Sequence, residues 1–104
     1  MGVTLFQKNV WEALSKIPKG KITTYGDIAN YLGTNAVRAV GTAVGKNPNA
    51  PQVPCHRVVK ADGSIGNYSA EGGVAKKIAL LKSEGVLVQN EKIVDFEVQR
   101  YCFG

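Results

Sequence analysis

The sequence predicts one mainly α-helical domain with small β elements, built around a helix-turn-helix. Three observations lead to this prediction. The 104 residues are enough for one modest hydrophobic core and too few for two, so we expect a single domain over 1–104. Apolar side chains recur at helical spacing in four segments, two of them separated only by a glycine-containing turn. The remaining apolar residues form short β-branched runs between turn signals.

The first helix is predicted from Thr4 onward. Thr4 and Gln7 have the spacing of a capping box, in which each side chain accepts a hydrogen bond from the other residue's backbone. Pro18 and Gly20 are typical of a helix end. The apolar positions at helical spacing are Phe6, Val10, Ala13, Leu14 and Ile17, with Trp11 beside the same core. A short extended segment follows.

A helix-turn-helix is predicted over about residues 24–46. Thr24 is a suitable N-cap, with an aspartate three residues on, and this helix ends at Gly33. Asn35 is expected to cap the next helix, which runs over about 36–46. Two short helices joined by such a turn are common in DNA-binding proteins, although plain helical hairpins share the pattern.

The second of these helices has two distinct faces. Val37, Val40 and Val44 form a stripe that we expect to face the core. The other face carries the long cation of Arg38 among small residues, namely Gly41, Thr42 and Gly45. Two glycines within a helix cost roughly 1 kcal/mol each relative to alanine, so close approach of another surface should compensate. Packing on a neighbouring helix would also explain small residues, but a guanidinium suits a groove in DNA better.

Charge is unevenly distributed along the chain, whose formal net charge is +5. Residues 1–60 carry eight basic and two acidic side chains, whereas the remainder carries five basic and six acidic ones. The basic part favours a polyanionic partner such as nucleic acid. Surface lysines that only confer solubility fit the charge alone at least as well.

Composition argues against several other classes. Apolar runs are short and interrupted by polar residues, so no transmembrane helix or signal peptide is expected. Two distant cysteines and one histidine form neither a disulfide framework nor a good metal set. We therefore expect no metal, no other cofactor and a reducing cytoplasmic location. Cys102 is expected to be a packed or incidental residue.

The segment over about 47–69 contains the most reactive combination of side chains. Cys55 is followed by His56 and an arginine, a thiol beside a base and a cation, as a cysteine nucleophile requires. Pro54 predicts an extended approach to the cysteine, and two valines after it predict a short strand. In an extended segment neighbouring side chains point to opposite faces, so His56 would need a bend or a bridging water, and an orienting partner elsewhere. From these residues alone, an inert buried cysteine remains the alternative.

After a loop of small residues, a further helix is predicted over 74–84, with Gly85 as its C-terminal cap. The side chains expected to face the core are Ala75, Ile78, Ala79 and Leu81. Two β-forming runs, 86–88 and 93–96, flank a polar tetrad and predict a hairpin. The tail is expected to pack back on the body.

Five motifs follow one another along nearly the whole chain: Arg38-Ala39-Val40-Gly41, Asn47-Pro48, Pro54-Cys55-His56-Arg57-Val58-Val59, Gly66-Asn67-Tyr68-Ser69 and Leu80-Leu81-Lys82-Ser83-Glu84-Gly85. Their order and spacing resemble those of the 6-O-alkylguanine-DNA alkyltransferases, and the Pro-Cys-His-Arg-Val core is highly specific. The part resembled is the C-terminal, DNA-binding and active-site domain, which implies a winged helix-turn-helix-like fold.

The resemblance implies direct DNA repair by a single-turnover enzyme. An alkyl (methyl) group would pass irreversibly from the 6-oxygen of guanine to Cys55 after base flipping. The resemblance implies that His56 acts on the thiol through a water and that Glu84 orients the histidine. Tyr25 is implied to crowd the phosphate of the flipped nucleotide and to protonate the departing oxygen. Asn47 is implied to tie the DNA-binding helix to the active-site segment.

Arg38 is implied to fill the space that the flipped nucleotide leaves. Small side chains at Ala36, Ala39 and Gly41 would let the helix enter the minor groove, where little sequence is legible. The pocket wall is implied to include Val58, whose backbone reads the guanine edge, together with Pro54, Tyr68 and Ser69. The implied partner is double-stranded DNA with an alkylated guanine, bound by a monomer in the cytoplasm, at the nucleoid or in a nucleus.

Departures from the family's pattern keep a second hypothesis open. The N-terminal domain of most full-length alkyltransferases is not expected, the loop after Tyr68 is longer than usual, and the tail from Gly85 resembles that of the alkyltransferase-like proteins. Those proteins bind alkylated DNA without repairing it and pass the lesion to excision-repair proteins, but they have tryptophan or another residue where this chain has Cys55. The remaining hypotheses are a winged-helix regulator with a redox thiol, which would prefer one DNA sequence, and a cysteine hydrolase, for which no oxyanion hole is marked.

Overall fold

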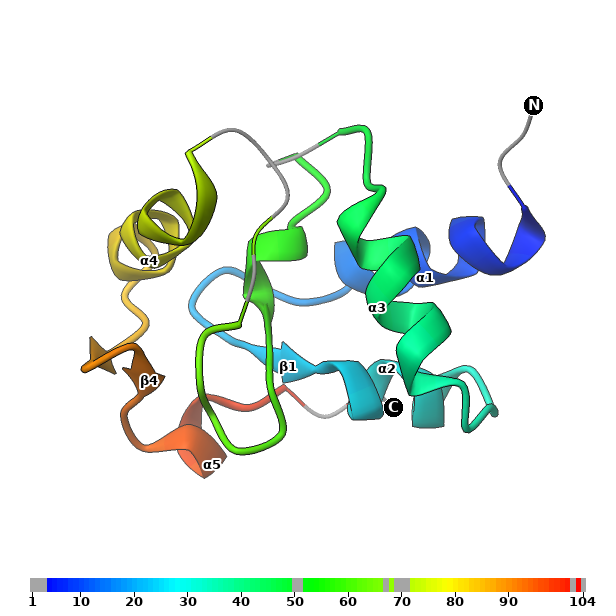
Figure 1. Ribbon diagram of the computed structural model, residues 1–104. Coiled ribbons are helices and arrows are strands. Elements are labelled where there is room, and N and C mark those ends of the chain that lie inside the picture. The colour runs from blue at the N-terminus through cyan, green and yellow to red at the C-terminus, as the bar shows by residue number, and fades with distance from the viewer. Residues whose placement is uncertain (1–3, 50–51, 67, 69–71, 102, 104) are drawn as a thin grey trace.

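Helices account for most of the regular structure, and each strand is only two residues long (Figure 1). The computed structural model describes residues 4–49, 52–66, 68, 72–101 and 103. The elements in chain order are α1 (Leu5–Ser15), β1 (Thr23–Thr24), α2 (Tyr25–Tyr31), α3 (Val37–Gly45), the 3₁₀ turn η1 (Cys55–Arg57), β2 (Val58–Val59), α4 (Gly73–Ser83), β3 (Val88–Gln89), β4 (Lys92–Ile93) and α5 (Phe96–Gln99). The predicted class, mainly α-helical with small β elements, is confirmed.

Helix α1 begins where the sequence predicts. The Thr4 side chain accepts a hydrogen bond from the Gln7 backbone, and the Gln7 side chain accepts one from the Thr4 backbone, so the capping box is confirmed. The helix ends before Ile17, which is nevertheless buried. The Trp11 indole donates to the Ala43 carbonyl at 2.8 Å and so ties α1 to α3.

Helix α2 and the turn after it also follow local signals. The Thr24 side chain accepts a hydrogen bond from the Asp27 backbone at 3.0 Å, which confirms the predicted N-cap. Gly33 follows the end of α2 with a φ of 75°, a left-handed conformation that glycine adopts without a steric penalty. The chain then turns directly into α3, which packs on α2.

The start of α3 differs from the prediction in two ways. Asn35 does not cap the helix, because Ala36 occupies that position and donates its backbone N–H to the Thr34 hydroxyl, 3.1 Å away. Val37 is 43% exposed, so the predicted core stripe is wrong at its first position. As the first helical residue, Val37 lies at the open end of α3, on the rim of a cavity. The inward face consists of Val40, Ala43 and Val44.

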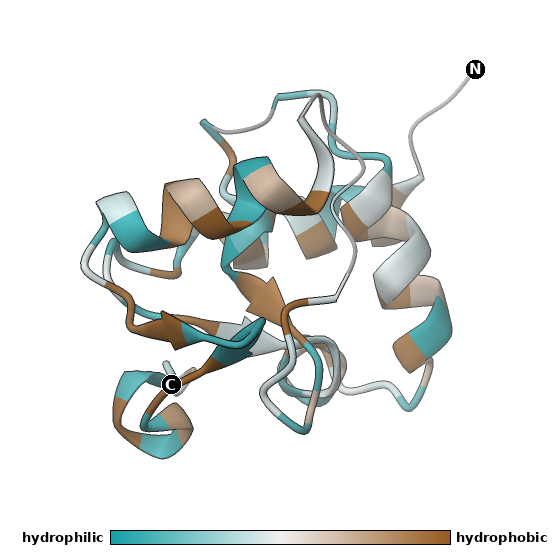
Figure 2. Ribbon diagram, turned by 60° about the vertical axis from the view of Figure 1, so that its left-hand side comes forward, coloured by the Kyte–Doolittle hydropathy of each residue, from teal (hydrophilic) through white to brown (hydrophobic). Residues whose placement is uncertain are grey.

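The hydrophobic core has two parts that meet at the strand pair β1–β2. One part lies among α1, α2 and α3, and the other among β2, α4 and the β3–β4 hairpin. Val58 belongs to the first part and Val59 to the second, because successive strand side chains face opposite sides. In Figure 2 the apolar strand β2 lies near the middle of the molecule, between the helices.

The pairing of β1 with β2 positions the reactive segment. The two strands are parallel, with Thr23 opposite Val58 and Thr24 opposite Val59. Helix α2 begins directly after β1, and the cysteine turn η1 directly precedes β2. Tyr25, the first residue of α2, is therefore brought beside Cys55 although thirty positions of chain separate them.

Helix α4 and its glycine cap are present, but its inward face differs from the prediction. Ala75 and Ala79 are exposed, whereas Lys77 is 1% exposed. The Lys77 stem is apolar and its ammonium donates to the Ile65 carbonyl at 2.6 Å, so a lysine can replace the expected small apolar residue. The face turned to the core therefore consists of Val74, Lys77, Ile78 and Leu81. Gly85 follows with a φ of 90°.

The predicted hairpin is confirmed but is shorter than expected. Strands β3 and β4 are antiparallel, and Asn90 and Glu91 turn between them with positive φ. The run expected over 93–96 is wrong at its end, because Asp95 adopts a φ of 54° and begins the short helix α5. The tail packs back as predicted, with the Phe103 ring stacked on Tyr31 at 4.5 Å. Cys102 lies outside the described residues.

Candidate active site

Cys55 lies in a turn of 3₁₀ helix and not in the extended segment that Pro54 was expected to impose. The Pro54 carbonyl accepts a hydrogen bond from the Arg57 backbone at 3.1 Å and closes the turn. Proline suits the start of a helical turn as well as an extended chain, which explains the difference. Consecutive residues of a 3₁₀ helix are about 120° apart, so the Cys55 and His56 side chains leave the chain on neighbouring sides.

His56 is buried and contacts a carboxylate from another element. Its Nε2 lies 2.9 Å from Oε2 of Glu84, the residue that ends α4. Arg57 holds the same carboxylate with two hydrogen bonds, from Nε at 2.8 Å and Nη2 at 2.7 Å. Its Nη1 donates to the Ile17 carbonyl at 2.7 Å. The carboxylate is therefore fixed by a planar fork and directed at the histidine.

The protonation states of this pair follow from its surroundings. Burial acts to raise the pKa of Glu84, but hydrogen bonds from Arg57 and His56 together outweigh burial and lower it. Burial lowers the pKa of His56, and the contact with Glu84 only partly opposes this. At neutral pH an ionised carboxylate therefore faces a neutral imidazole whose Nε2 carries the proton. His56 Nδ1 is then a buried acceptor, and within the described residues it forms no hydrogen bond.

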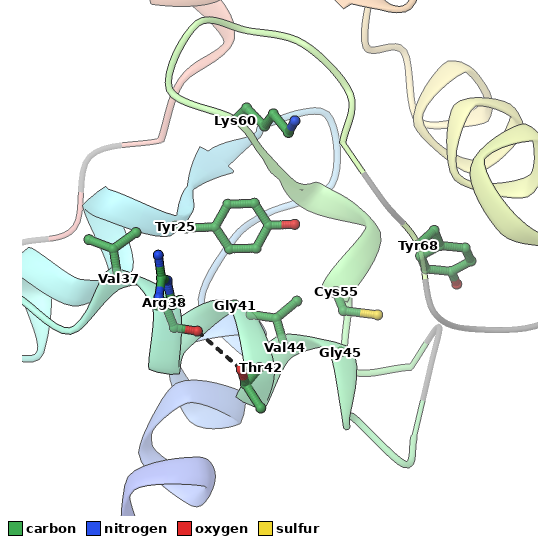
Figure 3. A pocket seen from close by; sticks show the side chains of 10 residues that line it. All are labelled: Tyr25, Val37, Arg38, Gly41, Thr42, Val44, Gly45, Cys55, Lys60 and Tyr68. Carbon is green, nitrogen blue, oxygen red and sulfur yellow. Dashed lines mark hydrogen bonds between the residues drawn. The ribbon is translucent and has the colours of Figure 1, made fainter.

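A cavity of about 440 Å³ adjoins the sulfur of Cys55 (Figure 3). This volume is within the range of about 300–1,000 Å³ found for small-molecule sites. In Figure 3 the sulfur points toward Tyr68, and the Tyr25 ring lies between α3 and Lys60. The lining residues are Tyr25, Val37, Arg38, Gly41, Thr42, Val44, Gly45, Cys55, Lys60 and Tyr68.

The two tyrosines in the cavity wall both keep their protons at neutral pH. Burial raises the pKa of Tyr25, and negative charge on the nearby Cys55 raises it further. The same two causes raise the pKa of Tyr68. Each phenol is therefore a proton or hydrogen-bond donor directed at whatever occupies the space beside the sulfur.

Asn47 connects α3 to the cysteine segment. Its Nδ2 donates to the Val53 carbonyl at 2.7 Å, and its Oδ1 accepts from the Asn49 backbone at 3.0 Å. The Val53 carbonyl also accepts from the Cys55 backbone at 2.9 Å. One carbonyl thus links the asparagine side chain to the residue that bears the thiol.

The outward face of α3 presents the residues that the sequence singled out for DNA. Arg38, Ala36 and Ala39 are exposed, and Gly41 is half-buried. Arg38 and Gly41 line the cavity, whereas the two alanines lie outside its lining. A long cation therefore stands at the rim of the cavity on an otherwise thin helix.

Two residues predicted for the pocket wall, Val58 and Pro54, are buried and are not among its described lining residues. Tyr68 lines the cavity as predicted. Ser69 lies outside the described residues.

A sequence model described as 6-O-methylguanine DNA methyltransferase, DNA binding domain, matches residues 5–86. The chain belongs to this family. It is 48% identical over 88 residues to a methylated-DNA–protein-cysteine methyltransferase of Salmonella typhimurium, a match that covers 84% of this chain and 50% of the relative. The chain spans about half the length of the curated methyltransferases it matches.

Two solved structures place this methyltransferase-family domain among its relatives. OGT of Mycobacterium tuberculosis in complex with DNA is 49% identical, with a TM-score of 0.75 over 80% of this chain and 51% of that one. Atl1 of S. pombe, in complex with damaged DNA containing O6-carboxymethylguanine, is 30% identical, with a TM-score of 0.83. The second match covers 97% of this chain and 98% of Atl1.

Sequence reasoning missed two lysines near the site of this family member. Lys60 lines the cavity, and Lys77 is buried within electrostatic range of Cys55. Lys77 could have been found, because it completes a helical stripe with Val74 and Leu81. The position of Lys60 had no local signal, since it depends on how the chain folds after β2.

Neither a metal centre nor a membrane span is found among the described residues. No group of three or more His, Cys, Asp or Glu side chains in this part of the chain is arranged to hold a metal ion. Its helices are too short or too polar to cross a bilayer.

Proposed function

We propose that this chain is a single-turnover DNA alkyltransferase that transfers an alkyl (methyl) group from the 6-oxygen of guanine to Cys55. The observation that carries the proposal is the position of Cys55 in the cavity wall, next to a histidine whose far nitrogen is held by Glu84. The thiol and the base come from η1 and the orienting carboxylate from the end of α4, which supports the set of groups that an activated cysteine nucleophile requires.

The proton of the thiol leaves through His56. A water between the sulfur and the buried Nδ1 would carry it, and the imidazolium would be stabilised by the ionised Glu84. The sulfur then attacks the alkyl carbon, the S–C bond forms as the C–O bond breaks, and guanine leaves as an oxyanion. The buried, unbonded Nδ1 supports this route, because it supplies the acceptor that the step needs.

Departure of guanine is assisted by Tyr25. Its phenol lines the cavity and keeps its proton at neutral pH, so it can donate to the guanine oxygen as negative charge develops there. The proton on His56 finally restores the phenol through solvent. Guanine then moves the proton from O6 to N1 as it takes its stable 6-oxo form, so the net change is one S–H and one C–O bond exchanged for one S–C and one N–H bond.

Access to the lesion requires base flipping, since the 6-oxygen substituent is enclosed in a duplex. The exposed small side chains of α3 would let the helix approach the minor groove, and Arg38 would occupy the space left in the base stack. Flipping costs a few kcal/mol and costs least for a badly paired base, which favours alkylated guanine over normal guanine.

The direct test is incubation of the chain with duplex DNA carrying labelled O6-methylguanine. We expect the label to move to protein, intact mass to rise by one methyl group, and Cys55→Ser to abolish both. Tight lesion binding without label transfer would overturn the proposal. Arg38→Ala should reduce transfer far more than nonspecific duplex binding, and equal losses would argue against the role of Arg38 in flipping.

A second candidate function is lesion recognition without efficient transfer, followed by recruitment of excision-repair proteins. The structural likeness to Atl1, with a TM-score of 0.83, favours it, because Atl1 is in complex with damaged DNA containing O6-carboxymethylguanine. The two functions separate in the same assay, since a recognition module would bind the methylated duplex and leave the label on DNA.

A further inference from the structure

Lys60 is a cation in the wall of the cavity that the proposed transfer chemistry does not use. It directly follows β2, five residues after Cys55, and lines the same cavity. Figure 3 shows its side chain extended along the side of the cavity opposite α3, with the Tyr25 phenol between them. A group attached to the guanine oxygen and directed at the sulfur would enter the space that these residues share.

The stem of Lys60 packs against Gly66 in the turn that follows β2. A Cβ atom at Gly66 would lie 3.4 Å from Lys60 Cγ, an ordinary van der Waals distance. Gly66 has a φ of 75°, which other residues rarely adopt. The backbone N–H of Lys60 also donates to the Ser64 carbonyl at 2.9 Å. The backbone of Lys60 is therefore fixed by the turn, while its exposed side chain reaches the cavity wall.

The charged side chains among the described residues of the cavity wall all have the same sign. Of the described residues that line it, Arg38 and Lys60 are basic and none is acidic. Within the described parts of the chain, no hydrogen bond or ion pair involves the Lys60 ammonium. The carboxylate of Glu84, outside the cavity lining, is already held by Arg57 and His56.

A third cation, Lys77, lies behind the cavity wall. Burial lowers the pKa of Lys77 to about 8, negative charge on Cys55 opposes this, and the charge of Lys60 adds to it. Lys77 therefore lies within electrostatic range of both Cys55 and Lys60. A neutral methyl group makes no use of such a field, whereas an anionic substituent would be attracted by it.

We propose that Lys60 is a specificity-determining residue that favours guanine adducts with an anionic alkyl group, of which O6-carboxymethylguanine is the smallest. This inference rests on the proposed function for the orientation of the substituent toward Cys55. The carboxylate would lie between the sulfur and the Lys60 ammonium. In the transfer, the S–C bond forms at the methylene carbon, the C–O bond to guanine breaks, and guanine takes up the proton. The carboxylate stays on the new thioether and remains beside Lys60.

Equilibrium binding tests the inference without requiring turnover. In the Cys55→Ser background, affinities are measured for duplexes carrying O6-carboxymethylguanine or the neutral, equally sized O6-carbamoylmethylguanine. We expect tighter binding of the carboxymethyl duplex. A partly exposed ion pair should change the ratio of the two affinities by about fivefold, and Lys60→Gln should abolish this fivefold preference. Lys60→Arg should keep it, and added salt should reduce it.

Lys82→Gln is the matched control, because it removes one exposed charge from α4 without altering the cavity lining. It should leave the ratio of the two affinities unchanged. An unchanged ratio in Lys60→Gln would overturn the inference. An equal loss for both duplexes would also overturn it, because Lys60 would then act on the DNA backbone.

Single-turnover transfer distinguishes failure of this inference from failure of the proposed function. With Cys55 present, the rate ratio for the two substituents should fall in Lys60→Gln and stay unchanged in Lys82→Gln, which lies outside the cavity lining. If the wild-type chain transfers neither group but the binding ratio still depends on Lys60, the proposed function fails and the selectivity stands. If all groups are transferred at ratios independent of Lys60, the selectivity fails and the function stands.

Discussion

Arg57 and Arg100 each hold a carboxylate with a planar fork, but in different surroundings. Arg57 binds Glu84 at 2.8 and 2.7 Å, and Arg100 binds Asp27 at 2.9 and 2.7 Å. The first pair is 14% and 9% exposed and the second 34% and 22%. Burial is the strongest influence on the pKa of Glu84, whereas the hydrogen bond from Arg100 is the strongest on that of Asp27.

The difference shows that the consequences of an arginine–carboxylate pair depend on how deeply the pair is buried. A buried carboxylate must have every lone pair satisfied, so Glu84 also engages His56, and Arg57 also engages a backbone carbonyl. The partly exposed pair can rely on water, and it joins the end of α5 to α2, with Glu97 as a second partner of Arg100. We therefore expect the same chemical change to have large consequences at Glu84 and small ones at Asp27.

The largest effect is expected for Glu84→Gln. Removing the charge leaves a buried guanidinium unpaired and deprives His56 of the group that stabilises its imidazolium. The rate of methyl transfer should fall by about 100-fold, typical of lost general-base assistance. The free energy of unfolding should fall by about 3 kcal/mol. Single-turnover assays and urea unfolding measure both, and a rate close to that of wild type would contradict the proposed relay.

The next largest effect is expected on the pH dependence of stability and comes from the buried Lys77. The pKa of this lysine has its ordinary value only in the unfolded chain. Because its folded pKa is lowered to about 8, the unfolded chain binds more protons between that pH and the ordinary value. The free energy of unfolding should therefore rise by about 2 kcal/mol from pH 8 to 10. The slope should vanish in Lys77→Met. If the free energy of unfolding of wild type and of Lys77→Met changed with pH in parallel, the buried Lys77 amine would not have a lowered pKa.

A smaller effect is expected at acid pH, where both carboxylates contribute with the same sign. Each folded pKa is lowered, so each contributes stability that is present at neutral pH and is lost as pH falls through the folded value. Urea unfolding between neutral and strongly acid pH measures how the free energy of unfolding depends on pH. This dependence should weaken more in Glu84→Gln than in Asp27→Asn. The reverse order would mean that the different exposure of the two ion pairs does not set their contributions to stability.

The smallest effect is expected for Asp27→Asn at neutral pH. The pair with Arg100 is partly exposed and screened, so the free energy of unfolding should fall by about 0.5–1 kcal/mol. Methyl transfer should remain unchanged, because the residue is outside the cavity lining. A loss comparable to that of Glu84→Gln would remove the distinction on which the comparison depends.

Local signals in the chain predicted the ends of its helices well. The hydrogen bonds at Thr4 and Thr24 and the left-handed glycines at Gly33 and Gly85 involve partners at most a few positions away. The errors fall where the deciding contact is distant. Lys77 is turned inward by the Ile65 carbonyl, and Val37 lies on a cavity rim that several elements form together.

For the candidate site, residue pattern and family resemblance named the participants, and packing decided how they meet. The motifs that carry the resemblance named Cys55, His56 and Glu84, because those motifs stand in the sequence itself. The contact of His56 with Glu84 and the shared cavity of Cys55 and Tyr25 depend on tertiary packing. Such arrangements arise from contacts between segments far apart in the chain, which no periodicity or local propensity encodes.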